Sequence, residues 1–169
     1  AAFATVEVRG AALIALRRAV LLMLPLAAFM LAVWVGIVGR APADIAAGLP
    51  HVFASTSEQF IPQMLNVDLI DGVSYTKGCY AGQEIVARTH NLGRVTRRTL
   101  RFHLPAGGAA PAPLSHLLLE GVKAADVLMT AETDDGIELL AVTNLDAAGK
   151  VLQLEDGRSA EPRALPYSL

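Results

Sequence analysis

The stretch TLRFHL, residues 99–104, alternates polar and apolar side chains along its whole length. A period of two is typical of a β-strand that buries one face, and here the buried face would consist of Leu, Phe and Leu. Several short apolar runs follow, separated by turn signals such as Asp135-Gly136 and Asp156-Gly157. Residues 94–169 therefore predict a small antiparallel β-barrel or sandwich.

Upstream of this β-rich part, residues 1–93 mix the signals of strands and helices. Residues 3–9 alternate as a half-buried strand would, and APADIAAGLP, residues 41–50, predicts a short helix or turn. From Cys79 to about residue 91 the chain has helix-forming residues and no proline, which predicts a second helix. The predicted fold class is α+β, with a mixed domain over 1–93 and a β domain over 94–169.

The apolar run at residues 19–39 carries no charge and is long enough to cross a bilayer. The mean hydropathy of the whole chain is also high, at +0.45. However, Pro25 and the strand-like residues in front of the run fit fragments of a protein core equally well. We expect core segments joined without their polar connectors, and hence neither a membrane span nor a membrane partner.

The single cysteine of the chain excludes an internal disulfide, and alone it cannot form a zinc or iron–sulfur site. No recognised metal-binding or phosphate-binding motif is present, so we expect no metal site. None of the histidines has a spacing that indicates a catalytic pair with the cysteine, which argues against a Cys–His hydrolase. These histidines are His51, His90, His103 and His116.

The cysteine lies in KGCYAGQE, residues 77–84. If Cys79 falls in the first turn of the predicted helix, the helix dipole and the charge of Lys77 both stabilise its thiolate form. Gly78 would allow a backbone conformation closed to other residues, and Gly82 would allow a ligand or another segment to approach closely. The alternative is that the thiol simply packs in the core, because free cysteine is among the most buried residue types.

Basic residues outnumber acidic ones between residues 77 and 101. A local basic patch suits an anionic ligand or an RNA backbone. The same residues would form an ordinary solvated face if their charges were paired with carboxylates of the β-rich part. The sequence leaves both interpretations open. The basic residues are Lys77, Arg88, Arg94, Arg97, Arg98 and Arg101.

The stretch FIPQMLNVDLIDGVSYTKGCYAGQEIVAR, residues 60–88, closely resembles the signature of the YgfZ family, K-G-C-Y-x-G-Q-E. Segments 44–52 and 164–169 also resemble parts of the family, so the resemblance covers about residues 44–169. The positions that match the signature are Lys77, Gly78, Cys79, Tyr80, Gly82, Gln83 and Glu84, and Arg88 fits the arginine that follows it.

This resemblance implies the aminomethyltransferase-like fold of the glycine-cleavage T-protein. In that fold, a mixed α/β N-terminal part and a C-terminal antiparallel β-barrel surround a channel for tetrahydrofolate. Residues 94–169 would form the barrel, and residues 1–93 would hold an α/β folate-binding part that is shorter than in the family. The resemblance also implies a cytoplasmic bacterial protein.

The implied function is that of a tetrahydrofolate-binding accessory protein for the assembly or repair of iron–sulfur enzymes, including those that modify tRNA. Its partners would be folate, iron–sulfur client enzymes and, indirectly, tRNA. Cys79 would be a reactive thiol, and Lys77 would hold it as thiolate or contact the anionic tail of the folate. The candidate cofactor-binding residues are Gly78, Tyr80, Gly82, Gln83, Glu84 and Arg88.

Two other functions are compatible with the sequence. One is an aminomethyltransferase-like, folate-dependent one-carbon transferase; the cysteine in the motif and the lack of an identifiable N-terminal catalytic acid favour the accessory role over this enzyme. The other is an RNA-binding module that uses Arg94, Arg97 and Arg98.

Overall fold

The computed structural model describes residues 25, 28, 30 and 40–169. The strand predicted at 3–9 and nearly all of the apolar run at 19–39 lie outside the described residues. The chain divides into two units, Ala1–Arg40 and Ala41–Leu169, and the description below concerns the second. Within the described residues, no helix combines the length and the apolar character needed to cross a bilayer.

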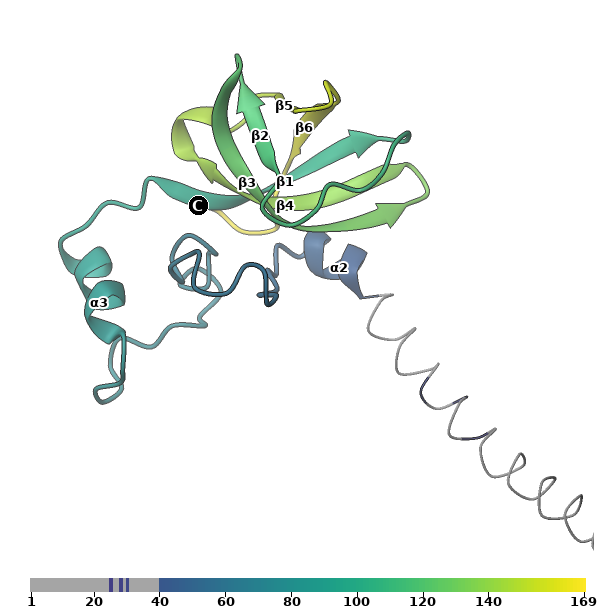
Figure 1. Ribbon diagram of the computed structural model, residues 1–169. Helices are drawn as coiled ribbons and strands as arrows, with labels where there is room; N and C mark the ends of the chain where they lie inside the picture. The colour runs from purple at the N-terminus through teal and green to yellow at the C-terminus, as the bar shows by residue number, and fades with distance from the viewer. Residues whose placement is uncertain (1–24, 26–27, 29, 31–39) are drawn as a thin grey trace, which may run out of the picture. The chain divides into compact units, whose positions relative to one another are not determined.

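Six antiparallel strands close into a barrel in the order β1-β4-β3-β2-β5-β6 (Figure 1). This confirms the predicted antiparallel barrel. A short 3-10 helix, η1 (Leu145–Ala147), follows β4. The strands are β1 (Arg97–Pro105), β2 (His116–Leu119), β3 (Val122–Thr133), β4 (Gly136–Asn144), β5 (Leu152–Leu154) and β6 (Ser159–Arg163).

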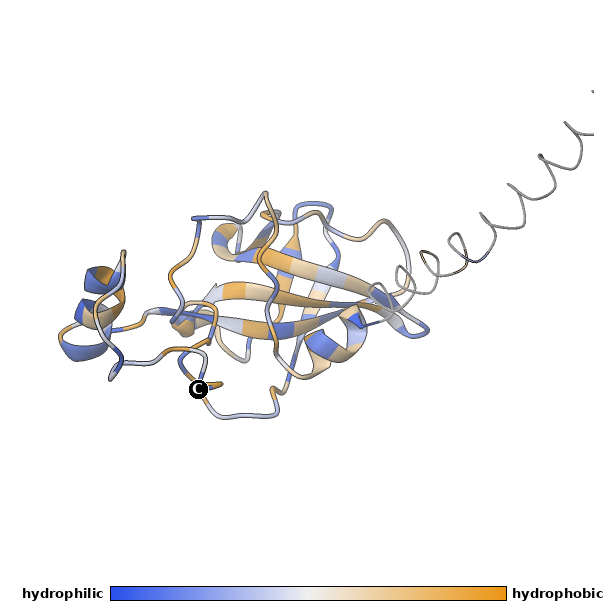
Figure 2. Ribbon diagram, turned by 90° about the horizontal axis from the view of Figure 1, so that it is seen from below, coloured by the Kyte–Doolittle hydropathy of each residue, from blue (hydrophilic) through white to orange (hydrophobic). Residues whose placement is uncertain are grey.

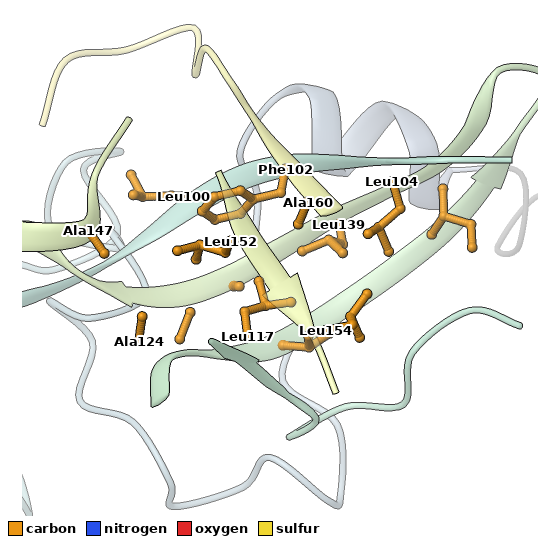
Figure 3. Close-up of a cluster of buried hydrophobic side chains, with 14 residues drawn as sticks. Leu100, Phe102, Leu104, Leu117, Ala124, Leu139, Ala147, Leu152, Leu154 and Ala160 are labelled. Carbon is orange, nitrogen blue, oxygen red and sulfur yellow. The ribbon is translucent and has the colours of Figure 1, made fainter. Parts of the chain in front are cut away.

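The alternating stretch at residues 99–104 is the centre of β1, which pairs with β4 on one side and with β6 on the other. Its apolar side chains, Leu100, Phe102 and Leu104, belong to the cluster that fills the barrel interior (Figure 3). Leu117, Leu139 and Leu152 bring side chains from three other strands to the same cluster. Their burial is the main stabilising contribution to the barrel.

A second apolar cluster covers part of the outer face of the barrel. The helix α2 (Ala41–Ala46), predicted as a short helix or turn, packs its fully buried Ile45 against Leu128, Met129 and Leu140 of β3 and β4. Because both faces of β3 are covered there, the strand is buried without interruption over residues 124–129. In Figure 2 the strands accordingly carry many orange, hydrophobic segments.

Strand β3 contains an extra residue relative to β4 between Val127 and Met129. Val127 pairs with Ala141, and both belong to the interior cluster, whereas Met129 pairs with Leu140, and both belong to the outer cluster. This β-bulge therefore exchanges which residues of β3 face inward. A second register shift separates Leu117 and Leu118, where β2 pairs with β3.

Between α2 and the second helix, α3 (Gln83–Asn91), the chain forms turns without a strand or helix. Arg98 of β1 holds this irregular segment through two hydrogen bonds to the Asp68 carboxylate, at 2.7 and 3.0 Å, and one to the Gln63 carbonyl, at 3.0 Å. The buried Asn66 amide also donates to the backbone carbonyl of Thr99, at 2.7 Å. The predicted domain boundary between residues 93 and 94 stays a prediction.

Replacement of Leu139 by alanine tests the interior cluster. Leu139 is fully buried, so Leu139→Ala should lower the free energy of unfolding by about 3 kcal/mol, through lost apolar contact and a residual cavity. Urea unfolding followed by circular dichroism measures this loss. Val122→Ala, at a position that is 70% exposed, is the matched control and should change stability little. Equal losses in the two variants would contradict this assignment of the core.

Candidate functional site

Residues 77–82 of the motif lie in an exposed loop that leads into α3, and the last two residues of the motif, Gln83 and Glu84, begin that helix. The Cys79 side chain is exposed, which contradicts the alternative that the thiol packs in the core. Helix α3 begins only at Gln83, so the expectation that Cys79 occupies its first turn is wrong. The predicted effect of the helix dipole on this side chain required that position, because the dipole acts within the first turn.

Lys77 and Tyr80 contact each other beside the cysteine. The ammonium nitrogen of Lys77 lies 4.4 Å from the centre of the Tyr80 ring, within the range of a cation–π interaction. The backbone N–H of Tyr80 donates to the side-chain oxygen of Gln83, at 3.2 Å, and the N–H of Gln83 donates to the Tyr80 carbonyl, at 3.3 Å. These bonds close the turn before α3 and give Gln83 a local structural role.

The two glycines of the motif have different roles from those predicted. Gly82, the residue before α3, has φ +80°, which only glycine adopts without strain. Apart from its neighbours in the chain, no described residue has an atom within 4 Å of the position that a Cβ would take there. Gly78 does not adopt a positive φ and is equally free of neighbours. The backbone requirement thus belongs to Gly82, and no other segment within residues 40–169 approaches either glycine closely. The predicted approach of a ligand to Gly82 stays a prediction.

A small cavity of about 170 Å³ lies where the motif loop meets α3. The rings of Tyr75 and His90 stack there, with 3.8 Å between their centres and 17° between their planes. The buried Gln63 amide, whose nitrogen lies 3.5 Å from the Tyr75 hydroxyl, donates to the Val86 carbonyl of α3, at 2.8 Å. The lining residues are Ser74, Tyr75, Lys77, Tyr80, Gln83, Ala87, His90 and Asn91.

The cavity brings together three of the predicted site residues, Lys77, Tyr80 and Gln83. The others lie outside its lining: Gly78, Cys79, Gly82, Glu84 and Arg88. Glu84 and Arg88 are both exposed, and neither takes part in an ion pair within residues 40–169. Tyr75 and His90 were not predicted as site residues, because their contact joins the loop to the last turn of α3, and no spacing rule indicates such a contact.

Three arginines of the predicted basic patch are paired with carboxylates. Arg97 bonds to Asp126 at 2.6 Å, Arg98 bonds to Asp68 as described above, and Arg101 bonds to Glu138 at 2.8 Å. For these three arginines the arrangement favours the second interpretation, in which their charges are paired with carboxylates of the β-rich part and with Asp68. Lys77, Arg88 and Arg94 take part in no ion pair within residues 40–169. Paired guanidinium groups are less available to RNA phosphates.

No protein-family model matches the chain. Curated proteins named tRNA-modifying protein YgfZ do match it. The protein from Yersinia pestis (strain Pestoides F) is 39% identical over 136 residues, which cover 75% of this chain and 40% of that protein. The protein from Serratia proteamaculans (strain 568) is 36% identical over 134 residues, with the same shares.

The chain belongs to the YgfZ-type family. It spans about 40% of the length of these curated relatives. The resemblance seen in the sequence is thereby confirmed at the level of the family. Within the described part of this YgfZ-type chain, no three His, Cys, Asp or Glu side chains gather in a way that could hold a metal ion.

The requirement for glycine before α3 can be tested with two alanine variants of the YgfZ-type chain. Gly82→Ala should destabilise the start of the helix by about 1 kcal/mol, because alanine is strained at φ +80°. Gly78→Ala is the matched control and should be nearly neutral. Hydrogen exchange of the α3 amides, measured by NMR, reports the local opening free energy. Equal protection in both variants would refute the assigned role of Gly82.

Asp126 makes the stability of the barrel depend on pH. Burial alone would raise the pKa of this carboxyl, but hydrogen bonds from Lys123 and Arg97, together with their charges, outweigh burial and lower the pKa below its usual 3.8. A carboxyl whose pKa is lowered in the folded state stabilises the fold above its unfolded pKa. This contribution is lost as the pH falls from 3.8 through the folded pKa.

Unfolding by urea at a series of pH values tests this dependence. Asp126→Asn should be less stable by about 1–3 kcal/mol near neutral pH, and its stability should fall less steeply than that of the original chain on acidification. Asp134→Asn, at an exposed position, is the control and should keep the original pH dependence. Parallel pH curves for Asp126→Asn and the original chain would contradict the prediction.

Proposed function

We propose that this chain is a tetrahydrofolate-binding accessory protein that assists the assembly or repair of iron–sulfur enzymes, including tRNA-modifying ones. The observation that carries the proposal is the exposure of Cys79 within the family motif, in a loop next to a cation and aromatic rings. An accessible thiol beside a ligand-binding surface can act on a client protein. A buried, inert thiol cannot.

The residues beside the cysteine fit a folate in their chemistry. The stacked Tyr75 and His90 and the ring of Tyr80 offer flat surfaces for a pterin or a benzoyl ring, and the Lys77 ammonium suits the carboxylates of the folate tail. The cavity of about 170 Å³ is smaller than the roughly 300–1,000 Å³ that encloses a drug-sized ligand. These residues would therefore contact one portion of the folate, and other residues would enclose the remainder.

The same proposal assigns the barrel and the motif segment to an aminomethyltransferase-like fold in a cytoplasmic protein. The closed six-stranded barrel after the motif is compatible with this fold. The relatives' printed name refers to tRNA modification, and the proposed route to it is indirect, through iron–sulfur enzymes that act on tRNA. In this proposal the paired arginines stabilise the protein and do not bind RNA.

Calorimetric titration with tetrahydrofolate tests the ligand. We expect saturable binding that Lys77→Gln weakens about tenfold, since an ion pair with a carboxylate is lost, while Lys150→Gln, at an exposed position outside the lining, has no such effect. Absence of saturable binding would contradict the proposed cofactor.

The role of the thiol is tested separately with Cys79→Ser. This variant should keep the melting temperature and tetrahydrofolate affinity of the original chain, because the side chain is exposed and lies outside the cavity. It should lose the ability to restore iron–sulfur enzyme activity in bacteria that lack their own YgfZ-type protein. Full restoration would exclude the thiol from the function.

Turnover in a methylene-transfer assay would assign the chain to the aminomethyltransferases instead.

A further inference from the structure

A second and larger cavity, of about 590 Å³, lies on the outer face of the barrel, away from the motif residues in sequence. Strands β1, β4 and β6 contribute Arg101, His103, Glu138 and Arg163 to its lining, and the turn after β3 contributes Asp135. None of these residues belongs to the loop or to the helix that form the proposed folate-contacting surface. The cavity therefore requires an explanation of its own.

Two arginines stand next to each other on neighbouring strands in this cavity. Arg101 of β1 and Arg163 of β6 are direct partners in the antiparallel register, so their side chains project from the same face of the sheet. Like charges directly opposite each other destabilise a strand pair. Arg163 makes no ion pair or side-chain hydrogen bond to any other residue that the structure describes, so its positive charge is uncompensated by a direct partner.

Arg101 is held in position by a single carboxylate. Its Nε donates to one oxygen of Glu138 at 2.8 Å, and the other oxygen of Glu138 lies 3.0 Å from Nδ1 of His103. All three side chains are at least three-quarters buried. Because Arg101 uses only Nε for this contact, the hydrogen-bond donors of its two terminal nitrogens are left for a ligand.

The negative charges of the lining are arranged differently from the positive ones. Glu138 already binds two partners, Arg101 and His103, and Asp135 comes from the hairpin turn rather than from the paired strands. The two guanidinium groups thus come from directly paired residues of neighbouring strands, whereas the two carboxylates come from a strand and from a turn. Arginine is the side chain best suited to bind planar or tetrahedral oxyanions through two parallel hydrogen bonds.

We propose that this outer cavity is a binding site for a small oxyanion, a phosphate or carboxylate group, held between Arg101 and Arg163. Glu138 acts as a positioning residue, because its carboxylate fixes the guanidinium of Arg101. His103 in turn fixes the carboxylate of Glu138. The site goes beyond the proposed folate function, since it uses strands of the barrel and no residue of the motif.

Calorimetric titration of the whole chain with inorganic phosphate, and in a second arm with glutarate, tests the proposal at constant ionic strength. We expect saturable binding of at least one of the two anions. Arg163→Gln should weaken that binding at least about tenfold, since charge-assisted hydrogen bonds are lost. Tighter binding of phosphate would indicate a phosphorylated ligand, and tighter binding of glutarate a carboxylate ligand.

Lys150→Gln is the matched control, because it removes one positive charge at an exposed position outside this cavity. It should leave the affinity unchanged. Arg163 is exposed and without an ion-pair partner among the described residues, so Arg163→Gln should fold, which an unchanged or higher melting temperature without the anion would verify. Lack of saturation with both anions would overturn the proposal, and so would equal weakening by Arg163→Gln and Lys150→Gln.

Discussion

The ion pair between Asp68 and Arg98 connects the irregular part of this chain to its barrel. Both side chains are about 13% exposed, and the Arg98 guanidinium donates three hydrogen bonds to the irregular segment, one to Gln63 and two to Asp68. A pair so placed combines charge attraction with fixed geometry, which a single surface contact does not provide. The motif loop comes shortly after Asp68 in the chain, so the ion pair of Asp68 with Arg98 fixes the segment that leads into the loop to β1.

Buried amides extend the same attachment. Asn66 binds the backbone of β1 and also the hydroxyl of Tyr167, which in turn donates to the Gly48 carbonyl at 2.8 Å. Gln63 reaches the backbone of α3. The segment 47–82 has no regular strand or helix. Its backbone forms turns through hydrogen bonds of its own, and its side chains attach it to β1 and α3 by binding their backbone carbonyls. Such a segment can present the exposed motif loop while the residues before the loop, around Gln63 to Asp68, stay attached to β1 and α3.

Much of the barrel could be predicted from the sequence, and the long strand β3 could not. In residues 99–104 the alternation identifies the side that faces the barrel interior, because Leu100, Phe102 and Leu104 all belong to the interior cluster, although Thr99 and His103 on the opposite face are also buried. In β3 the period of two disappears, since α2 covers its second face and the bulge changes which residues face inward. Short turns such as Asp135-Gly136 were visible because their residue types are specific to turns.

Of the predicted site residues, Lys77, Tyr80 and Gln83 line one cavity, while the local geometry around them differs from the prediction. Local sequence indicated a helix from Cys79, whereas the left-handed Gly82 delays its start to Gln83. Contacts between distant residues gave no local signal: the stacking of Tyr75 on His90 and the pairing of Arg97 with Asp126 join positions far apart in the chain.

The bulge at Leu128 has a further consequence for how the barrel and its covering helix are built. One additional residue places two large apolar side chains, Leu128 and Met129, in succession toward α2, where a regular strand would offer only one. The same insertion increases the local coiling of a strand that must curve to close a narrow barrel. The curvature of β3 and the apolar surface that contacts Ile45 thus both arise from the bulge. Removal of the extra residue would change the curvature of the strand and the packing of α2 together.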